Sequence, residues 1–322
     1  MGIGDLPNPR EAHKLIRSVV GRFHEEQCMA PTRDCEGPII AAHTLSCEAT
    51  LRPMSREGHV YTVHNNPYAE INEITSIRRT GIKDATTFNG FCQKHDREIF
   101  SPIEKRPFVC AHEQVFLHGF RAVAKESFLK RRQAETIPTP ESISKIHNLD
   151  EDNQFQMSED GNIYRGYSFE GANDIDHLKR ELDKIYIHKE WRRLYSTIIP
   201  FKKCPPVACN FVFSPDFDYA GNELQDFQDT SSPLEMIMVT ITAGHGEGGF
   251  AILSHLDTAN SASSAFVKSL IVQPDLSSAL TWMVIRRTET LHSHHCGMSR
   301  LMHNRRRLSC GSLCKRWALP LT

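Results

Sequence analysis

The chain has 322 residues, of which 39% are hydrophobic and 24% charged, and its formal net charge is −1. This composition is typical of a globular protein, the length suits two domains of ordinary size, and the near-zero charge gives the chain no general attraction for nucleic acid. No apolar run approaches the ~20 residues of a membrane span, and the N-terminus lacks the pattern of a secretion signal. We therefore expect a cytoplasmic protein with no membrane partner, whose ten cysteines are thiols or metal ligands rather than disulfides.

The first predicted element is a helix over residues 10–27, because apolar side chains such as Leu15, Ile16 and Phe23 recur there at helical spacing. This helix leads directly into Cys28. From Cys28 to Glu104 the sequence is rich in Cys, His, Gly and Pro and offers only short strands. Such a stretch buries little apolar surface by itself, so it needs an external staple such as a metal ion.

The remaining elements predict a mixed α+β protein, with an antiparallel sheet in its C-terminal part. The predicted helices cover residues 108–132, 174–195 and 260–271, and the predicted strands cover 207–214, 236–243 and 250–256. The glycine-rich residues 244–249 read as a hairpin connection. The expected organisation is an N-terminal helix (1–27), a zinc module (28–104), a helix (105–135), a polar linker (136–160), an α+β domain of unknown role (161–280) and a tail (281–322).

The tail from residue 281 shows neither periodicity nor turn signals. No acidic residue follows Glu289, and the segment is basic. Cys296, Cys310 and Cys314 lie near several histidines, but their context is too irregular to predict a metal site. We expect residues 281–322 to be a disordered or out-of-frame extension that the fold does not need.

Two pairs of residues are candidate zinc ligands: Cys28 with Cys35, and Cys92 with His95. The second pair has the C-x-x-H spacing that lets two side chains at a helix start reach one tetrahedral ion, whereas the first pair, with Pro31 inside it, is more loosely spaced. Together the pairs predict one structural Zn²⁺. The other cysteines before residue 210 are expected to be buried or idle thiols: Cys47, Cys110, Cys204 and Cys209.

Between the pairs, the apolar residues 39–42 predict a short strand that ends on His43. Residues 91–100 have helical character and carry Asp96. A histidine facing a carboxylate suits metal-assisted phosphodiester cleavage, because neutral imidazole accepts a proton from water and the carboxylate holds a hard cation such as Mg²⁺. Two alternatives stay open: His43 can be a packed structural histidine, and Asp96 can simply favour the positive end of a helix dipole.

Residues 28–104 resemble an HNH-type nuclease domain, a His-Me finger built on a treble-clef zinc site. The resemblance rests on Ala42-His43-Thr44-Leu45-Ser46 and on residues 85–104, which contain Thr87-Phe88-Asn89-Gly90-Phe91-Cys92 followed by His95-Asp96. It is strongest with a group of uncharacterised bacterial proteins. Similarity to that group continues through residues 211–215 and 249–254 and ends near residue 280.

The resemblance implies a small zinc-bound ββα module and a role for each matching residue. His43 matches the general base, and the two pairs match the structural zinc ligands. Asp96 stands where HNH enzymes place a metal-binding histidine, which is compatible with catalytic Mg²⁺ or Mn²⁺. Asn89, or Thr87 in its place, matches the middle asparagine. The implied function is a metal-dependent endonuclease acting on nucleic acid, DNA before RNA, in bacterial defence against phage.

Two other functions remain open at this point. The zinc module can recognise a nucleic acid or protein partner without catalysis, or it can be a structural zinc knuckle that supports the C-terminal half.

Overall fold

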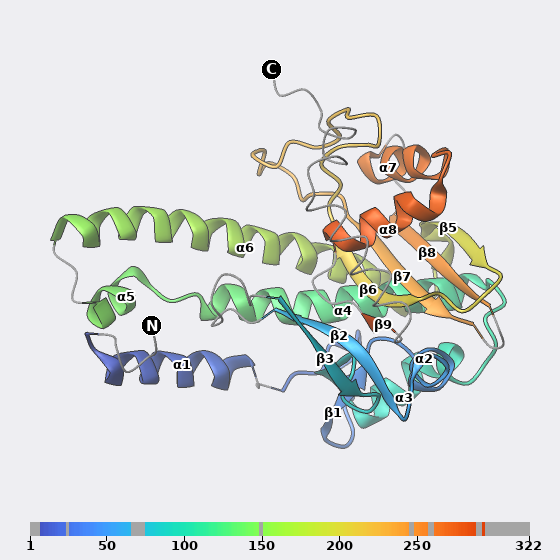
Figure 1. Cartoon of the computed structure of the whole chain (residues 1–322), viewed down its shortest axis with the longest axis horizontal. Helices are drawn as coiled ribbons and strands as arrows, with labels where there is room; N and C mark the ends of the chain where they lie inside the picture. Colours follow the sequence, from blue (N-terminus) through green and yellow to red (C-terminus); the bar gives the residue numbers. More distant parts are fainter. Residues whose placement is uncertain are drawn as a thin grey trace.

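The computed structural model describes residues 7–23, 26–65, 75–147, 151–244, 248–256, 261–287 and 292–293, and shows the expected mixed α+β fold (Figure 1). The helices are α1 (Pro9–Phe23), α2 (Arg52–Met54), α3 (Gln93–Glu104), α4 (His112–Thr136), α5 (Pro140–His147), α6 (Glu151–His188), α7 (Ala262–Ile271) and α8 (Leu276–Arg287). The strands are β1 (Ile39–His43), β2 (His59–Asn65), β3 (Thr75–Gly81), β4 (Thr87–Cys92), β5 (Leu194–Phe201), β6 (Val207–Phe213), β7 (Ile237–Ala243), β8 (Gly249–Leu256) and β9 (His292–Ser293).

A two-stranded antiparallel sheet of β1 and β4 carries the predicted motif residues. His43, the last residue of β1, lies opposite Thr87, and α3 begins directly after Cys92. Gly90 packs so closely against Phe88 that an added Cβ would lie 2.0 Å from the phenyl ring, so β4 requires glycine there. The predicted strand ending on His43 and the predicted helix after Cys92 are both confirmed.

The larger sheet has seven antiparallel strands in the order β3-β2-β9-β6-β7-β8-β5. Strands β6, β7 and β8 confirm the three predicted strands, and α7 confirms the predicted helix over 260–271. The predicted hairpin joins β7 to β8, pairing Ala243 with Gly249, while residues 245–247 lie outside the described part.

Helices cover both faces of this sheet. Phe211, Val239 and Leu253 face α7 and α8, which contribute Phe266 and Met283 to the same core. On the opposite face the sheet packs against α4, and α6 runs alongside α4 (Figure 1). With both faces covered, β7 is buried along its whole length, which explains the nearly continuous apolar sequence of these strands.

Helix α4 is the centre of the molecule, because it packs against α1, α3, α6 and the large sheet. Its predicted apolar side is confirmed by the buried residues Val115, Phe116, Phe120, Val123 and Phe128. The predicted core residues of α6 and of the segment that follows it are also buried: Leu178, Leu182, Ile185 and Leu194. The position of α4 means that it touches both the small sheet and the large one.

The structure differs from the expected linker over residues 136–160. Helix α5 lies there, and α6 begins at residue 151. Pro140 and Ile146 of α5 are buried, and α6 crosses α5 at Gly161, where an added Cβ would lie 3.1 Å from the Pro140 ring. The polar composition suggested a loop, but these few apolar contacts are enough to dock a helix whose other sides face water.

The helix predicted over 174–195 also ends earlier than expected. Lys189 adopts a left-handed conformation (φ 57°), its amide donates to the Tyr186 carbonyl, and α6 stops at His188. The next residues form β5, which the sequence analysis missed. Strand β5 is an edge strand, and this position tolerates Pro200 in its ladder.

The boundary placed at residue 280 is wrong by at least seven residues. Helix α8 continues to Arg287, and Met283 and Val284 are buried against the sheet. Residues 292–293 form β9, which pairs with β2 and β6. The remainder of the expected tail, including the cluster around Cys296, Cys310 and Cys314, lies outside the described residues.

Part of the expected zinc module joins the C-terminal sheet. Strands β2 and β3, from residues 59–81, extend the seven-stranded sheet through β9. The Thr50 hydroxyl also hydrogen-bonds the Thr242 hydroxyl on β7. Within the described residues, no helix is both long and apolar enough to cross a lipid bilayer.

Candidate metal centre and the adjacent histidine site

The four predicted zinc ligands converge on one point, with their ligand atoms all within 4.8 Å of one another. The Nδ1 atom of His95 lies 3.3 Å from the Sγ of Cys28, 3.7 Å from that of Cys35 and 3.2 Å from that of Cys92. We name these four residues the Cys3His cluster. In the described part of the chain it is the one group of three or more His, Cys, Asp or Glu side chains placed to share a metal ion.

Backbone hydrogen bonds bring the two pairs together. The amide of Met29 donates to the Gly90 carbonyl (2.8 Å), which aligns the segment before Cys35 with β4. The amide of Gln93 donates to the Pro38 carbonyl (3.0 Å), which holds the loop after Cys35 against the start of α3. Cys28 and Cys35 are therefore positioned by hydrogen bonds to β4 and to the start of α3 rather than by a tight local turn.

The start of α3 also lowers the pKa of the Cys92 thiol. Burial opposes ionisation of Cys92, but hydrogen bonds from the backbone amides of His95 and Glu36 bring its pKa to about 7. Burial and the neighbouring thiols raise the pKa of Cys35 to about 11. A thiolate at a helix N-terminus is a ready metal ligand, and a bound cation would ionise the other thiols as well.

A second layer of polar groups orients the His95 ring. Its Nε2 atom lies 3.1 Å from Oδ1 of Asp34 and 3.0 Å from the Thr32 hydroxyl. Asp34 is held in turn by the Lys94 ammonium (2.8 Å), and this hydrogen bond keeps the pKa of Asp34 far below its usual range. A carboxylate on Nε2 leaves Nδ1 with its lone pair toward the thiols, as in carboxylate–histidine–zinc sites.

The donor set fits zinc. Zinc–sulfur bonds of about 2.3 Å and zinc–nitrogen bonds of about 2.0–2.1 Å in a tetrahedron put neighbouring sulfur and nitrogen ligands about 3.5 Å apart. The three sulfur–nitrogen distances of 3.2 to 3.7 Å surround that value. The cluster can therefore hold a metal ion such as zinc.

His43 lies at one end of the two-stranded β1–β4 sheet, and Cys92 lies at the other. Its Nδ1 atom lies 2.9 Å from the Ala85 carbonyl oxygen and 3.2 Å from the Thr86 hydroxyl. Because a carbonyl oxygen can only accept, Nδ1 carries the proton and Nε2 keeps the lone pair in the neutral ring. The surroundings thus fix the tautomer in which Nε2 is a proton acceptor.

Thr86 is held in an unusual backbone conformation beside this histidine. Its φ angle is 65°, in the left-handed region that β-branched residues avoid. The Thr86 carbonyl accepts from the Thr44 amide (2.9 Å) while its hydroxyl reaches His43. Backbone strain of this kind concentrates at functional sites, where the surrounding structure enforces a required geometry.

Two carboxylates and one arginine complete the electrostatic surroundings of His43, and we name His43, Asp96, Glu104 and Arg121 the His43 site. Arg121 of α4 donates to Glu104 (2.5 Å) and lies 3.7 Å from Oδ1 of Asp96. That Asp96 oxygen is buried and makes no hydrogen bond with the described residues. Glu104 also accepts from the Ser46 hydroxyl (2.8 Å). Both Glu104 oxygens thus accept hydrogen bonds, whereas Oδ1 of Asp96 can still accept one.

Burial and charge shift the acidities in this site. Burial lowers the pKa of His43 below its usual value, and Arg121 lowers it further, while the Ala85 carbonyl and the two carboxylates act in the opposite direction. Burial raises the pKa of Asp96 in spite of Arg121. Although Glu104 is also buried, the Arg121 charge and its hydrogen bond lower the pKa of that carboxyl. The lowered pKa favours the uncharged form of the His43 imidazole near neutral pH.

The two candidates for the middle asparagine lie on β4. Thr87 lies directly opposite His43, and its hydroxyl donates to the Asp84 carbonyl (2.9 Å). Asn89 lies two residues further along, where its backbone carbonyl accepts from the Gln27 amide (3.4 Å). Of the two, Thr87 is the nearer to His43 in the ladder.

Sequence reasoning missed Ser46, Glu104 and Arg121. Glu104 and Ser46 lie at the ends of the segments that carry the resemblance, so their polarity beside apolar neighbours was an available signal. Arg121 gave none, because an arginine within an amphipathic helix normally faces water. Its burial at 2% exposure follows only from the packing of α4 against α3.

The other described cysteines form no disulfide. Cys209 is fully buried, which raises its pKa to about 12, and burial also raises the pKa values of Cys47 and Cys204. Cys110 is exposed. These four cysteines lie outside both the Cys3His cluster and the His43 site.

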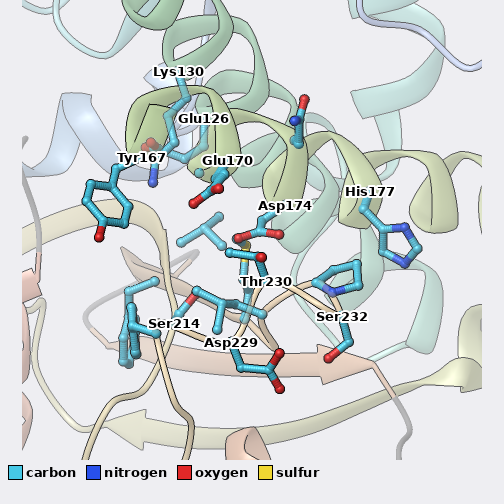
Figure 2. A pocket seen from close by; sticks show the side chains of 18 of the residues that line it. Glu126, Lys130, Tyr167, Glu170, Asp174, His177, Ser214, Asp229, Thr230 and Ser232 are labelled. Atoms are coloured by element: carbon cyan, nitrogen blue, oxygen red, sulfur yellow. The ribbon is translucent and has the colours of Figure 1, made fainter. Parts of the chain in front are cut away.

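A cavity of about 860 Å³ lies between α4, α6, the loop 227–236 and the ends of β6 and α8 (Figure 2). Glu170 and Asp174 point into it from α6, opposite Asp229 on the loop. Lys130 and Arg286 also line it. Its mixture of acidic and basic groups favours no single ligand, and it shares no residue with the Cys3His cluster or the His43 site.

The chain matches no known family, no curated protein and no solved structure. The chemistry of these two groups of residues is therefore the basis for any statement about function.

Proposed function

We propose that this protein is a metal-dependent endonuclease of the HNH type, which hydrolyses phosphodiester bonds of nucleic acid, with DNA as the expected substrate. The observation that carries the proposal is the state of His43: its tautomer is fixed by the Ala85 carbonyl, and burial keeps it neutral. A general base needs this combination of a free lone pair and an uncharged ring near neutral pH.

His43 takes a proton from water at Nε2 in the proposed reaction, while Nδ1 stays bonded to Ala85. The strained Thr86 backbone supports this role, because it keeps a second polar atom on Nδ1 and prevents the ring from turning. The attacking oxygen forms its bond to phosphorus as the bond to the leaving oxygen breaks. Fixed orientation of the base reduces the reorganisation that this step requires.

Asp96 is the residue that would hold Mg²⁺ or Mn²⁺. Its Oδ1 atom accepts no hydrogen bond from the described residues and is the kind of hard donor these ions prefer. Mg²⁺ commonly uses one or two protein carboxylates together with water and substrate phosphates. Such an ion, when bound, offsets the negative charge that builds up on the phosphate. Glu104 anchors Arg121 rather than competing for this position.

Zinc in the Cys3His cluster is proposed as the structural element of the same module. It would pin the start of α3 to β4, and so set the spacing between His43 on β1 and Asp96 on the first turns of α3. This division of roles assigns zinc to the scaffold and His43 with Asp96 to the chemistry.

The proposal is tested with a cleavage assay on plasmid DNA and on RNA, using the zinc-loaded full-length protein with Mg²⁺ or Mn²⁺. We expect His43→Ala to lower cleavage by about 10²–10⁴ without changing zinc content or thermal stability. Asp96→Asn is expected to lower cleavage in a way that higher Mn²⁺ concentrations partly restore. His59→Ala is the matched control, because His59 is also half-buried and also bonds a backbone carbonyl through Nδ1 (2.8 Å), but lies outside the His43 site.

Cleavage unchanged in His43→Ala would remove this residue from the mechanism. The Cys3His cluster alone also favours a second function, a non-catalytic zinc module that binds nucleic acid or a protein partner. Binding of labelled DNA that weakens steeply with salt, without cleavage under any divalent metal, would favour this second function over the first.

A further inference from the structure

Arg121 is the one member of the His43 site that comes from outside residues 28–104. It is only 2% exposed, and it comes from α4, which packs against α3 and β4. Burying a charge is costly unless the charge is paired and hydrogen-bonded. A buried arginine at this position therefore needs an explanation in terms of its partners.

Two contacts hold the guanidinium in place, and one further charged group faces it. One nitrogen donates to Glu104, which the Ser46 hydroxyl fixes from the other side. The central carbon lies 4.1 Å from the centre of the Phe100 ring, a cation–π contact with a fully buried side chain. The second terminal nitrogen faces Asp96 at 3.7 Å, too far for a hydrogen bond. Arg121 is thus anchored on Glu104 and Phe100 and acts on Asp96 through charge alone.

The charged groups that influence the pKa of His43 come from two elements. Helix α3 contributes the carboxylates of Asp96 and Glu104, and α4 contributes Arg121. The segment before β4 contributes only uncharged groups, the Ala85 carbonyl and the Thr86 hydroxyl. The single cation therefore opposes two anions that would otherwise draw a proton onto the imidazole.

We propose that Arg121 is the electrostatic positioning residue of the His43 site: its guanidinium is hydrogen-bonded to Glu104 and lies 3.7 Å from Asp96, and so sets the balance of charge around His43. The proposal rests on His43 being the base of the proposed function. Arg121 does not touch the reacting atoms, so it acts through its neighbours. It also makes the site depend on α4, and hence on the core shared with the C-terminal sheet.

The test is a histidine NMR titration of ¹⁵N-labelled, zinc-loaded full-length protein without added Mg²⁺, with His43 assigned by comparison with His43→Ala. Arg121→Met keeps the length of the side chain but removes its charge, and should raise the midpoint of His43 protonation by about one pH unit. Glu104→Gln removes a negative charge and should lower that midpoint. Arg121→Lys retains the charge and should stay near wild type. Arg131→Met is the matched control, since Arg131 lies on the same helix but pairs with Asp176 of α6.

Opposite shifts in Arg121→Met and Glu104→Gln support the proposal, because a purely structural role would loosen the site and move both midpoints upward. An unchanged midpoint in Arg121→Met, or upward shifts in both variants, would overturn it. If Arg121→Met does not fold, Glu104→Gln decides alone: a lower midpoint supports the proposal and an unchanged or higher one contradicts it. The titration needs no substrate, so absence of cleavage would remove the proposed function without affecting this result.

Discussion

The Cys3His cluster and His43 lie at opposite ends of the two-stranded β1–β4 sheet, and the cluster and the His43 site are built differently. The cluster takes all its donors from residues 28–95, and a single ion can satisfy them together. The His43 site combines β1 and α3 with a buried arginine from α4, and its members interact mainly through charge. The Cys3His cluster is a local cross-link, whereas the His43 site depends on how helices that are distant in sequence pack against each other.

This difference implies that the cluster contributes mainly to the stability of the fold and the His43 site mainly to proton transfer. Soft thiolate and imidazole ligands bind zinc strongly, and the binding free energy of such a site is also folding free energy. Buried charges at the His43 site add little net stability, because desolvation offsets their attraction. Changes in the cluster should therefore unfold the module, whereas His43→Ala should alter proton transfer and leave the fold intact.

The largest effect is expected from Cys92→Ala. This change removes the most central thiol of the cluster, so the protein should lose its zinc and residues 28–104 should lose their fold. Metal analysis and thermal unfolding followed by circular dichroism measure both losses. Cys110→Ala, at an exposed cysteine outside the cluster, is the control. Full zinc content in Cys92→Ala would contradict the assignment of the ligands.

A smaller effect is expected when α8 is shortened. Ending the chain at residue 280 removes the buried Met283 and Val284 from the core against β6, so the melting temperature should fall markedly. Met283→Ala alone should cost about 2–5 kcal/mol. Zinc content should not change, because the cluster shares no residue with this core.

Differential scanning calorimetry of the chain ending at 280, compared with one ending at Ser293, measures this effect. The longer chain keeps α8 and β9 and should melt close to the full-length protein. Equal melting temperatures for the two shortened chains would show that α8 contributes nothing to the sheet.

Asp34→Asn should weaken zinc binding without unfolding the protein. Replacing the carboxylate on His95 Nε2 weakens the orientation and basicity of the ring, and such changes cost about 10–100-fold in affinity. The exposure of Asp34 places the expected loss near the lower end of that range. Competition with a chromophoric chelator measures the affinity. Glu36→Gln is the control, because Glu36 pairs with Lys94 but not with His95, and an equal loss in both variants would argue against a role for the carboxylate on His95.

The smallest effect concerns pH. Burial lowers the pKa of His43, so the imidazole stays unprotonated at a lower pH than an exposed histidine would. Because the base acts only when unprotonated, cleavage should persist as pH falls and should be lost only below the usual histidine pKa of about 6.5. The dependence of kcat/KM on pH measures the midpoint. A midpoint at or above that usual value would show that His43 is not buried during catalysis.

Most of the metal centre was predictable from the sequence, and much of the fold was too. Cys92-x-x-His95 at a helix start, the strand ending on His43 and the apolar runs of β6, β7 and β8 are local patterns, and the structure confirms each of them. The misses share a cause. The expected linker forms α5 and the start of α6, and the start of the expected tail forms the end of α8. These segments are polar on average, but a few buried apolar side chains are enough to dock them as helices.

What the sequence alone determined, then, is the position of the donors along the chain, because ligand spacing and hydrophobic periodicity are short-range properties. What only the tertiary structure decided is the charge environment of His43. Arg121 and Glu104 are 17 residues apart and on different helices, and their ion pair exists because α4 packs against α3. Electrostatic interactions depend on distance in space and on burial, and neither can be read from the order of residues.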